Sequence, residues 1–535
     1  MNPEYDVDVL VLGGGLAGLT LALQLRARFA DLSITVLERK QHPLPTAAHK
    51  VGESTVEIGA NYFESVLGLK PLLMQNQLKK FGFRFFFSEG EREIDGVTEL
   101  GASTFLPTGS WQIDRGIFEN DLAEECTRRG IRFLDGAVVR DIDLDAKSRH
   151  RCRVERGGES NEYSARWIVD ASGRAGLLKR KLDLAQTNDH NANAVWFRIS
   201  ERIDVNDWST DESWLDRCNP RTRWLSTIHL CGEGYWVWLI PLSSGSHSVG
   251  IVCDADIHPL DTMNTWEKAL SWFERFQPRL FEALKDKRDQ LQDFLFFRHF
   301  SYSCKQVFSG DRYALTGEAG VFLDPFYSPG SDFIAISNTY ITELIAKDLA
   351  GEPVAPYARI YEQFYFSFYE STMALYQDQY RIFGDAEVMP TKVIWDYAYY
   401  WGILAQIYFQ RRLTDLVSLS RLREPLEHVK ALNAAIQKLL RDWSAAGLRP
   451  NPKRMLDQAS LPWFRELNRS LQDTLDDAGY RARMIENVGM LKDLAREIHA
   501  RAVLDVPGLA NHELVALLET GTDSAEPSRL FERAA

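Results

Sequence analysis

The distribution of hydrophobic and polar positions changes character near residue 350 of the 535-residue chain. Before that point, apolar runs of strand length alternate with helical patterns, as is typical of mixed α/β folds. From Val354, glycines become sparse and long stretches with helical periodicity predominate, over 360–383, 392–409, 426–446 and 481–499. We therefore predict an α/β region over 1–350, a mostly helical region over 351–518, and a loose polar tail over 519–535.

The first 40 residues predict a β-α-β unit. A strand over 9–12 precedes the run GGGLAG at 13–18, a helical pattern follows over 19–28, and SITVLE at 33–38 reads as the second strand. Gly13, Gly15 and Gly18 fit the GxGxxG fingerprint, which lets the backbone approach a pyrophosphate at a helix N-terminus. Glu38 ends the second strand, where a carboxylate accepts hydrogen bonds from an unphosphorylated ribose. FAD or NAD, rather than NADP, is the cofactor that this unit predicts.

The segment LKKFGFRFFF at 78–87 predicts one uninterrupted strand. Alternation then places the odd-numbered phenylalanines on one face together with Lys79, and the even-numbered positions, Lys80 among them, on the other face. Lysine is almost never fully buried without a partner. One of these lysines is therefore either the solvated edge of a strand or a charge that is carried to a reactive site.

Composition and charge exclude several classes of protein. The chain is 45% hydrophobic and 26% charged with a formal net charge of −13, which argues against binding to nucleic acid. Its six cysteines form no CxxC pair, so we expect no metal site, no disulfide framework and a cytoplasmic location. The acidic N-terminus does not resemble a signal peptide, and the apolar run at 7–25 contains Asp8 and four glycines, so we expect no membrane span.

Two later motifs favour FAD over NAD. WIVDASG at 167–173 ends a strand at Asp170, and SGDRYALTGEAG at 309–320 leads a strand into Gly317 and Glu318. In this order after the first fingerprint, the motifs resemble those of FAD-dependent enzymes of the aromatic hydroxylase type. The resemblance implies a Rossmann-like FAD-binding domain with an interwoven substrate-facing sheet, roughly over 80–110 and 190–300. In that family an aspartate of the third motif binds the ribitol chain of FAD, and Glu318 stands in its place.

The strand YWVWLIP at 235–241 narrows the resemblance to flavin-dependent halogenases. Without the neighbouring motifs, this segment would be interpreted as an ordinary core strand. In the halogenase family the Trp-x-Trp-x-Ile-Pro pattern forms the wall of a tunnel between flavin and substrate, which implies this role for Trp236, Trp238, Ile240 and Pro241. Phenol-directed halogenases carry a similar Lys-x-Gly-x-x-Phe strand, which matches Lys80 and Gly82 and therefore selects Lys80, not Lys79, as the catalytic residue.

Further segments extend this resemblance over most of residues 5–340. KVGEST at 50–55 is similar to a flavin-covering segment, and QIDR at 112–115 is similar to a helix start whose arginine approaches the cofactor. FLDPFYSPG at 322–330 resembles the loop whose amides hold a halide, which implies Ser328 and Gly330 for that role. The cofactor residues implied by the resemblance are Gly13, Gly15, Leu16, Ala17, Gly18, Glu38, Arg39, Lys50, Val51, Gly52, Glu53, Ser54, Arg115, Asp170, Gly317, Glu318 and Gly330.

The resemblance also implies an activity. Reduced flavin (FADH2) and O2 form a flavin hydroperoxide, chloride or bromide attacks it, and the resulting hypohalous acid travels to Lys80. The lysine presents the halogen to an electron-rich aromatic ring such as a phenol, a resorcinol or a pyrrole, free or carrier-bound, and the helical region covers this site. A dry setting strengthens the electrostatic effect of the lysine. A separate NAD(P)H-flavin reductase is the expected source of reduced flavin.

Three positions depart from the halogenase pattern. Tyr327 stands where tryptophan halogenases carry a glutamate, which disfavours free tryptophan as substrate. Pro329 has no N–H, so the loop offers fewer amides to a halide. Asp332 either repels chloride or bonds a backbone amide. Two alternatives follow, namely an FAD-dependent aromatic hydroxylase and a catalytically silent flavoprotein scaffold.

The sequence does not decide the roles of several other residues. The many aromatic residues between 361 and 401 form either a helical core or a lid over an aromatic substrate. His229 and His247 flank the tryptophan strand and are either structural or candidates for a general base.

Overall fold

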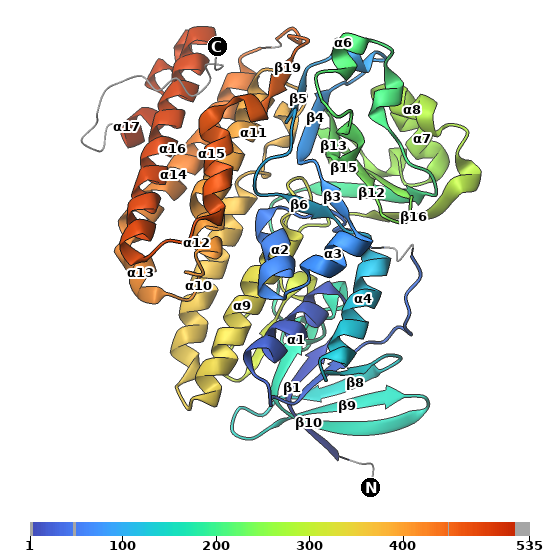
Figure 1. The fold of residues 1–535 in the computed structure, drawn as a ribbon, viewed down its shortest axis with the longest axis vertical. Coiled ribbons are helices and arrows are strands. Elements are labelled where there is room, and N and C mark those ends of the chain that lie inside the picture. The colour runs from blue at the N-terminus through green and yellow to red at the C-terminus, as the bar shows by residue number, and fades with distance from the viewer. Residues whose placement is uncertain (1–3, 47–49, 448, 519–535) are drawn as a thin grey trace. The chain divides into compact units, whose positions relative to one another are not determined.

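The computed structural model describes residues 4–46, 50–447 and 449–518, which form two compact units (Figure 1). The first unit consists of Met1–Leu78, Ile113–Asp189 and Ser301–Tyr369, and the second of Lys79–Gln112, His190–Phe300 and Glu370–Ala535. The mixed α/β class with a helical C-terminal region is confirmed. The predicted tail over 519–535 lies outside the described residues.

The first unit is built on a seven-stranded sheet with the order β7-β2-β1-β10-β9-β8, in which β18 also pairs with β10. The strands β7, β2, β1, β10 and β18 run parallel, and β8 and β9 extend the sheet as an antiparallel pair. The strand bounds are β1 Glu4–Leu12, β2 Ile34–Leu37, β7 Arg132–Leu134, β8 Val138–Asp143, β9 His150–Arg156, β10 Glu159–Asp170 and β18 Tyr313–Leu315. The predicted β-α-β unit is therefore confirmed as β1, α1 and β2.

Helix α1 (Leu16–Arg28) is buried on all sides from Leu16 to Leu25, because it packs on the sheet and between neighbouring helices of the first unit. The other helices of this unit are α2 Glu57–Asn61, α3 Lys70–Asn76, α4 Arg115–Arg128, α5 Leu177–Lys181 and α9 Gly330–Leu349, together with a π-helical turn Tyr62–Val66 and most of α10 Val354–Met373.

A buried polar side chain fixes α9 against α1 and against the end of β18. Asn338 of α9 donates hydrogen bonds to the carbonyl of Ala17 (3.2 Å) and to the hydroxyl of Tyr62 (3.0 Å), and it accepts one from Thr316 (2.7 Å). Buried amides need such partners. The network therefore sets the register between the third sequence motif, which contains Thr316, and the helix that carries the first motif.

The second unit contains an eight-stranded sheet with the order β16-β12-β15-β14-β13-β4-β5-β19. The strand bounds are β4 Phe83–Phe87, β5 Glu99–Gly101, β12 Ala192–Ile199, β13 Thr227–Gly232, β14 Tyr235–Pro241, β15 His247–Asp254, β16 Leu291–Phe297 and β19 Met455–Asp457. A short pair, β3 Leu78–Lys80 and β6 Ser110–Gln112, forms a separate ladder. Most of the sheet comes from the two segments predicted for it, and β19 joins it from the C-terminal region.

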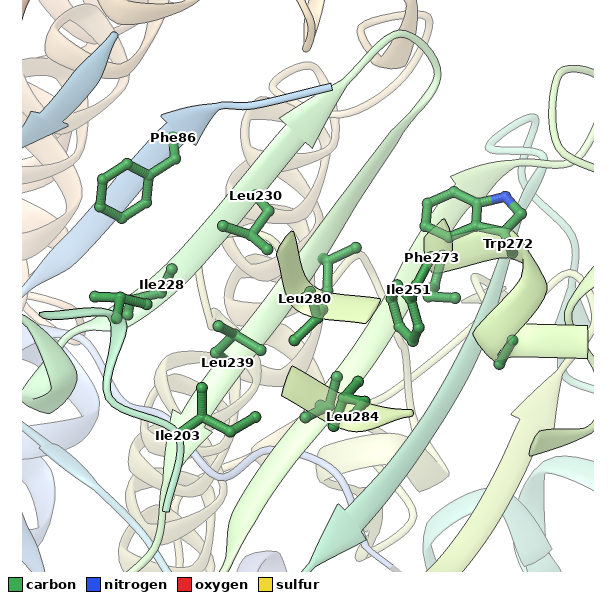
Figure 2. Close-up of a cluster of buried hydrophobic side chains, with 14 of the residues drawn as sticks. Phe86, Ile203, Ile228, Leu230, Leu239, Ile251, Trp272, Phe273, Leu280 and Leu284 are labelled. Atoms are coloured by element: carbon green, nitrogen blue, oxygen red, sulfur yellow. The ribbon is translucent and has the colours of Figure 1, made fainter. Parts of the chain in front are cut away.

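One face of this sheet carries the apolar core of the second unit (Figure 2). Ile228, Leu230 and Leu239 from β13 and β14 meet Trp272 of α7 (Trp266–Phe276) and Leu280 of α8 (Pro278–Leu284). Alternation along β14 assigns Tyr235, Val237 and Leu239 to this core. The two tryptophans of that strand therefore lie on the opposite face, as the sequence predicts.

The C-terminal helices of the second unit agree with three of the four predicted helical stretches. They are α11 Val388–Tyr399, a π-helical segment Tyr400–Ala405, α12 Gln406–Phe409, α13 Leu416–Arg421, α14 Arg423–Ala445, α15 Pro462–Arg469, α16 Asp477–Asp505 and α17 Leu514–Leu518. The stretch predicted over 360–383 is too long, since α10 ends at Met373 and a turn follows in which Asp378 takes a φ of 60°.

The described helices include none that is long and apolar enough to cross a membrane. Within the same residues, no cluster of three or more histidine, cysteine, aspartate or glutamate side chains is arranged to hold a metal ion. All six cysteines are buried free thiols.

Candidate active site

The three fingerprint glycines have different roles in the loop between β1 and α1. A Cβ on Gly13, which has a φ of 118°, would lie 2.3 Å from the carbonyl oxygen of Ala171, and one on Gly18 would lie 2.0 Å from the carbonyl oxygen of Gly13. Both glycines therefore permit close backbone packing. A Cβ on Gly15 would meet nothing nearer than two polar side-chain atoms at 3.9 Å. Space is thus present at the helix N-terminus, where the fingerprint predicts a pyrophosphate.

Glu38 lies at the end of β2 and supports this loop. Its Oε2 accepts the N–H of Gly14 and its Oε1 accepts the N–H of Lys40, both at 2.8 Å. A carboxylate offers about four lone-pair positions, so both oxygens retain capacity for ribose hydroxyls. The next residue, Arg39, is exposed.

An ion cluster that the sequence did not predict lies beside the loop. Glu119 of α4 is fully buried and forms ion pairs with both Lys50 and Arg115. Its Oε1 also accepts the N–H of Leu16 at 3.3 Å, so the carboxylate caps the N-terminus of α1. Arg115 further donates to the carbonyl of Val51 at 2.6 Å, which holds the KVGEST segment in place. These contacts bring together predicted cofactor residues from three separate motifs of the first unit.

The cluster alters the titration of its members. Burial by itself would raise the pKa of Glu119, but Arg115 and Lys50 outweigh this effect and hold that pKa below its ordinary value. Burial lowers the pKa of Lys50. The glutamate is therefore ionised throughout the neutral range and balances one of the two neighbouring cations.

We expect the Glu119→Gln variant to lose about 3 kcal/mol in the free energy of unfolding, because Lys50 and Arg115 would lose their buried counter-ion. A carboxylate with a depressed pKa stabilises the fold above its ordinary pKa of 4.5, and this contribution is lost as the pH falls through its folded-state pKa. Urea unfolding should therefore show a stability difference that shrinks below pH 4.5.

The matched control for this prediction is Glu125→Gln on the same helix. Glu125 pairs with Arg128 and Arg129; the side chain of Arg128 is 71% exposed, whereas those of Arg129 and Glu125 are 21% and 15% exposed, so this cluster is reached by solvent mainly at Arg128. Exposed pairs contribute roughly 0–1 kcal/mol. Equal losses in the two variants would show that the Glu119 cluster adds no special stability.

The second and third sequence motifs meet within the first unit. Asp170 is fully buried, and its carboxylate accepts N–H bonds from Ser172 (3.0 Å) and Leu178 (2.7 Å), so it closes the turn after β10. Glu318 forms an ion pair with Arg174 from that turn at 3.0 Å. Gly317 has a φ of 60° and packs where a Cβ would lie 2.8 Å from the Cβ of Ala17. Glu318 is one-third exposed, which leaves it accessible to a cofactor, whereas Asp170 already has internal partners.

The loop predicted for halide lies immediately before α9. Ser328 takes a φ of 52° and donates its N–H to the carbonyl of Pro325 at 2.9 Å, so this amide is used within the turn. Gly330 begins the helix, whose first N–H groups lack intrahelical acceptors. Asp332 is 2% exposed and accepts the N–H of Gly59 in α2 at 2.8 Å. Of the two interpretations of Asp332, the structure supports the bond to a backbone amide.

In the second unit, the predicted uninterrupted strand over 78–87 is wrong. It is divided into β3 and β4 by Phe81 and Gly82, and Gly82 takes a φ of 72°. The break reverses the expected faces of the two lysines. Lys80 is 2% exposed and its Nζ lies 3.5 Å from the ring centroid of Phe83, whereas Lys79 is exposed with its Nζ 5.0 Å from the ring of Phe105. The charge therefore approaches the phenylalanine face at Lys80.

An aromatic layer continues from Phe83 across the same face of the sheet. The ring of His229 on β13 stacks on Phe85 at 4.5 Å and lies 5.2 Å from Phe83 and 5.1 Å from Trp236. Trp238 follows at 5.8 Å from Trp236. Because β4, β13 and β14 are neighbours, the amine of Lys80, which reaches Phe83 from the separate strand β3, approaches the sheet face that carries the predicted tryptophan wall. Ile240 and Pro241 are buried at the end of β14.

Helix α11 adds an aromatic side chain to this layer. The ring of Tyr397 lies 6.0 Å from that of Phe83. Lys392 on the same helix is fully buried and donates to Asp396 (2.6 Å) and to Gln437 of α14 (2.8 Å), which fixes α11 on α14. Aromatic residues of the C-terminal helices are therefore part of the core and also contact the aromatic layer at Phe83 of β4.

The two histidines near the tryptophan strand differ in their surroundings. Burial lowers the pKa of His247 to about 3, and its Nδ1 accepts the N–H of Ile203 at 3.1 Å. His247 is therefore a neutral structural residue. His229 is fully buried within the aromatic layer described above.

Comparisons with known proteins agree with this geometry. Residues 6–269 match the protein family described as FAD binding domain. The chain is 26% identical over 436 residues to the flavin-dependent halogenase chlA of Dictyostelium discoideum, covering 75% of this chain and 70% of that protein. It is also 26% identical over 344 residues to the 1H-pyrrole-2-carbonyl-peptidyl-carrier-protein chlorinase of Pseudomonas fluorescens, covering 61% and 73%.

Solved structures show the same fold. The halogenase PltM superposes with a TM-score of 0.64 at 16% identity over 92% of this chain and 96% of that chain. The flavin-dependent brominase Bmp2 gives a TM-score of 0.56 at 22% identity over 71% and 89%. The cofactor loop, the domain match and the relatives together confirm the predicted resemblance: the chain is an FAD-dependent enzyme whose curated relatives are flavin-dependent halogenases.

Proposed function

We propose that this chain is a FADH2-dependent halogenase of electron-rich aromatic rings, in which Lys80 presents the halogen to the substrate. The observation that carries the proposal is the position of Lys80. It is 2% exposed, and its amine lies against Phe83, which belongs to the aromatic layer that contains His229 and Trp236. Buried lysines are rare outside functional or paired settings.

In this proposal the first unit holds and orients the cofactor. Bound FAD, once reduced, would supply two of the four electrons that O2 accepts, and oxidation of chloride or bromide to hypohalous acid would supply the other two. Gly15 would admit the pyrophosphate and Glu38 would accept hydrogen bonds from the ribose, and Arg115 and Glu318 would help to hold the cofactor. The amide of Gly330, at the N-terminus of the 20-residue helix α9, attracts the halide together with the Ser328 loop.

The residues of the second unit act on the oxidised halogen. Trp236, Trp238, Ile240 and Pro241 separate the substrate from the cofactor. The ammonium group of Lys80 donates a hydrogen bond to hypohalous acid, which makes the halogen more electrophilic. The aromatic carbon then attacks the halogen, the oxygen–halogen bond breaks, and the departing hydroxide takes a proton from Lys80 to form water. The proton that leaves the ring returns the lysine to its charged form.

The proposed substrate is a phenol, a resorcinol or a pyrrole, either free or attached to a carrier protein. One structural neighbour was solved with phloroglucinol and FAD, and one relative is named for a carrier-bound pyrrole. Tyr327 in place of an acidic residue argues against free tryptophan. Reduced flavin would come from a separate NAD(P)H-flavin reductase.

One assay tests the proposal. The protein receives enzymatically reduced FAD, O2 and either chloride or bromide, together with phloroglucinol, resorcinol and pyrrole-2-carboxylate, the last both free and as a carrier-protein thioester. Mass spectrometry should show the isotope pattern of the added halogen in at least one product. A single added oxygen would instead indicate an aromatic hydroxylase, and unchanged substrates would indicate a silent scaffold.

The structure weakens one of the two arguments for the hydroxylase alternative. Its two arguments were Pro329 and Asp332. The carboxylate of Asp332 is buried against the N–H of Gly59, so it has a structural role in the first unit. Pro329, as N-cap of α9, still removes one amide from the loop.

A further inference from the structure

The corner between β3 and β4 determines the direction of the Lys80 side chain. Lys80 and Phe83 are three positions apart, so a straight strand would place them on opposite faces. The positive φ of Gly82 changes the phase of the alternation, and the lysine amine reaches the ring of Phe83. Only glycine adopts this conformation readily.

The segment at residues 225–227 holds the corner through hydrogen bonds. The N–H of Phe81 donates to the carbonyl of Leu225 at 3.0 Å, and the carbonyl of Gly82 accepts the N–H of Thr227 at 3.0 Å. The hydroxyl of Ser226 also donates to the carbonyl of Phe81 at 3.3 Å. Three consecutive residues therefore bond to the three successive peptide groups of the corner.

A buried ion cluster joins this segment to the strand that follows the corner. Glu99 of β5 forms ion pairs with Arg84 of β4 and with Arg223, the latter at 2.9 Å, and all three side chains are 0% exposed. Arg223 precedes the holding segment by two residues, and Arg84 follows Gly82 by two residues. We name these three residues the Glu99 cluster.

The remaining donors of the Glu99 cluster are also used. Arg84 donates to the carbonyl of Ala102 at 2.5 Å, and Arg223 donates to the carbonyl of Trp214 at 2.7 Å. Apolar replacements of such buried ionic groups are often neutral or stabilising, so stability alone does not account for them. A fully satisfied network does hold its members in one geometry.

We propose that the Glu99 cluster is a positioning element for halogenation, which keeps the Gly82 corner closed and thereby holds the amine of Lys80 on the aromatic face. This inference rests on the proposed function of Lys80. Arg84, Glu99 and Arg223 act through the corner and touch neither cofactor nor substrate in this scheme. Placement of reacting groups to within about 0.5 Å is what such supporting shells provide.

The corner is tested with two glycine variants that impose the same backbone strain. Gly82 and Gly90 both have a φ of 72°, and an added Cβ would meet nothing within 4 Å at either position. We expect Gly82→Ala to lower the halogenated product formed per O2 consumed on the order of 100-fold. Gly90→Ala should match the wild type, and both variants should bind FAD normally. Equal coupling in the two variants would overturn the proposal.

The cluster itself is tested with the apolar triple variant Arg84→Met, Glu99→Leu and Arg223→Met. We expect it to fold, bind FAD and consume O2. The halogenated product formed per O2 consumed should nevertheless fall, as we expect for Gly82→Ala. Wild-type coupling in this variant would show that the cluster does not position Lys80.

Crystal structures of the variants supply a readout that does not depend on activity. The Lys80 amine should leave the ring of Phe83 in Gly82→Ala and in the triple variant, and should remain there in Gly90→Ala. A lysine that stays in place in all three refutes the inference. If the wild type forms no halogenated product, the proposed function is wrong. The crystal structures would still show whether the corner and the Glu99 cluster hold the Lys80 amine at Phe83.

Discussion

Halogenation by the Lys80→Ala variant should fall by on the order of 100- to 1000-fold, while FAD remains bound and O2 is still consumed. The reason is the separation of tasks between the units. The residues around Gly15 and Glu38 belong to the first unit, whereas Lys80 belongs to the second. Loss of the amine removes the donor that activates the halogen, and hypohalous acid or peroxide should then accumulate in its place. Chlorination of an added scavenger measures this release.

The chain offers a matched control in Lys79→Ala. Lys79 has the same charge and is adjacent in sequence, but it is exposed and lies over Phe105. We expect this variant to retain wild-type coupling. Lys80→Arg keeps a positive charge but replaces a compact ammonium with a planar guanidinium, so it should restore little activity. Normal turnover in Lys80→Ala would remove the central residue of the proposed function.

The strand that carries Lys80 shows what the sequence could and could not predict. The family pattern selected Lys80, which is the buried one of the two lysines, but alternation placed it on the wrong face. An isolated glycine within a strand pattern is a recognised signal of a bulge or close backbone approach, and Gly82 was that signal. Its phase change depends on hydrogen bonds from residues 225–227, which lie more than 140 positions away in the sequence. Local pattern contains no information on such partners.

The first unit was predicted more completely, since its motifs are local. The glycine loop and Glu38 occupy the places that their spacing implies, and α4 begins at Arg115. Glu119 was missed, although its position four residues after Arg115 on a predicted helix was an available sign of an ion pair. The pairing of Glu318 with Arg174 joins two motifs across the sheet, and no spacing rule reports it.

Helix ends in the C-terminal region were the least predictable features. The residues at 374–379 (ALYQDQ) include neither glycine nor proline, so propensity gave no reason to end α10 at Met373. Burial of Leu375 and Tyr376 in the second unit accounts for the turn. The π-helical segment at Tyr400–Ala405 has no sequence signal either, and its geometry is supported by Asn487, which donates to the carbonyl of Gly402 at 2.8 Å.

Substitutions at Gly15 and Gly18 should separate cofactor binding from folding. Gly18 lies inside α1, where helix propensity favours alanine over glycine by about 1 kcal/mol. A Cβ there would nevertheless lie 2.0 Å from the carbonyl oxygen of Gly13, a backbone atom that cannot move without distorting the loop. We therefore expect Gly18→Ala to lower the free energy of unfolding of the FAD-free protein and to yield little bound FAD.

Gly15→Ala should leave the stability of the FAD-free protein unchanged and lower only the affinity for FAD. Gly15 has a φ of −86° and a ψ of −172°, which alanine adopts freely, and its Cβ would have no neighbour closer than 3.9 Å. In the FAD-bound protein the same space is the approach of the pyrophosphate. Titration with FAD should show an affinity lower by about tenfold or more, equivalent to about 1.4 kcal/mol, at an unchanged midpoint of thermal unfolding without FAD. Unaltered affinity in this variant would mean that the pyrophosphate does not bind beside Gly15, whatever the effect of Gly18→Ala.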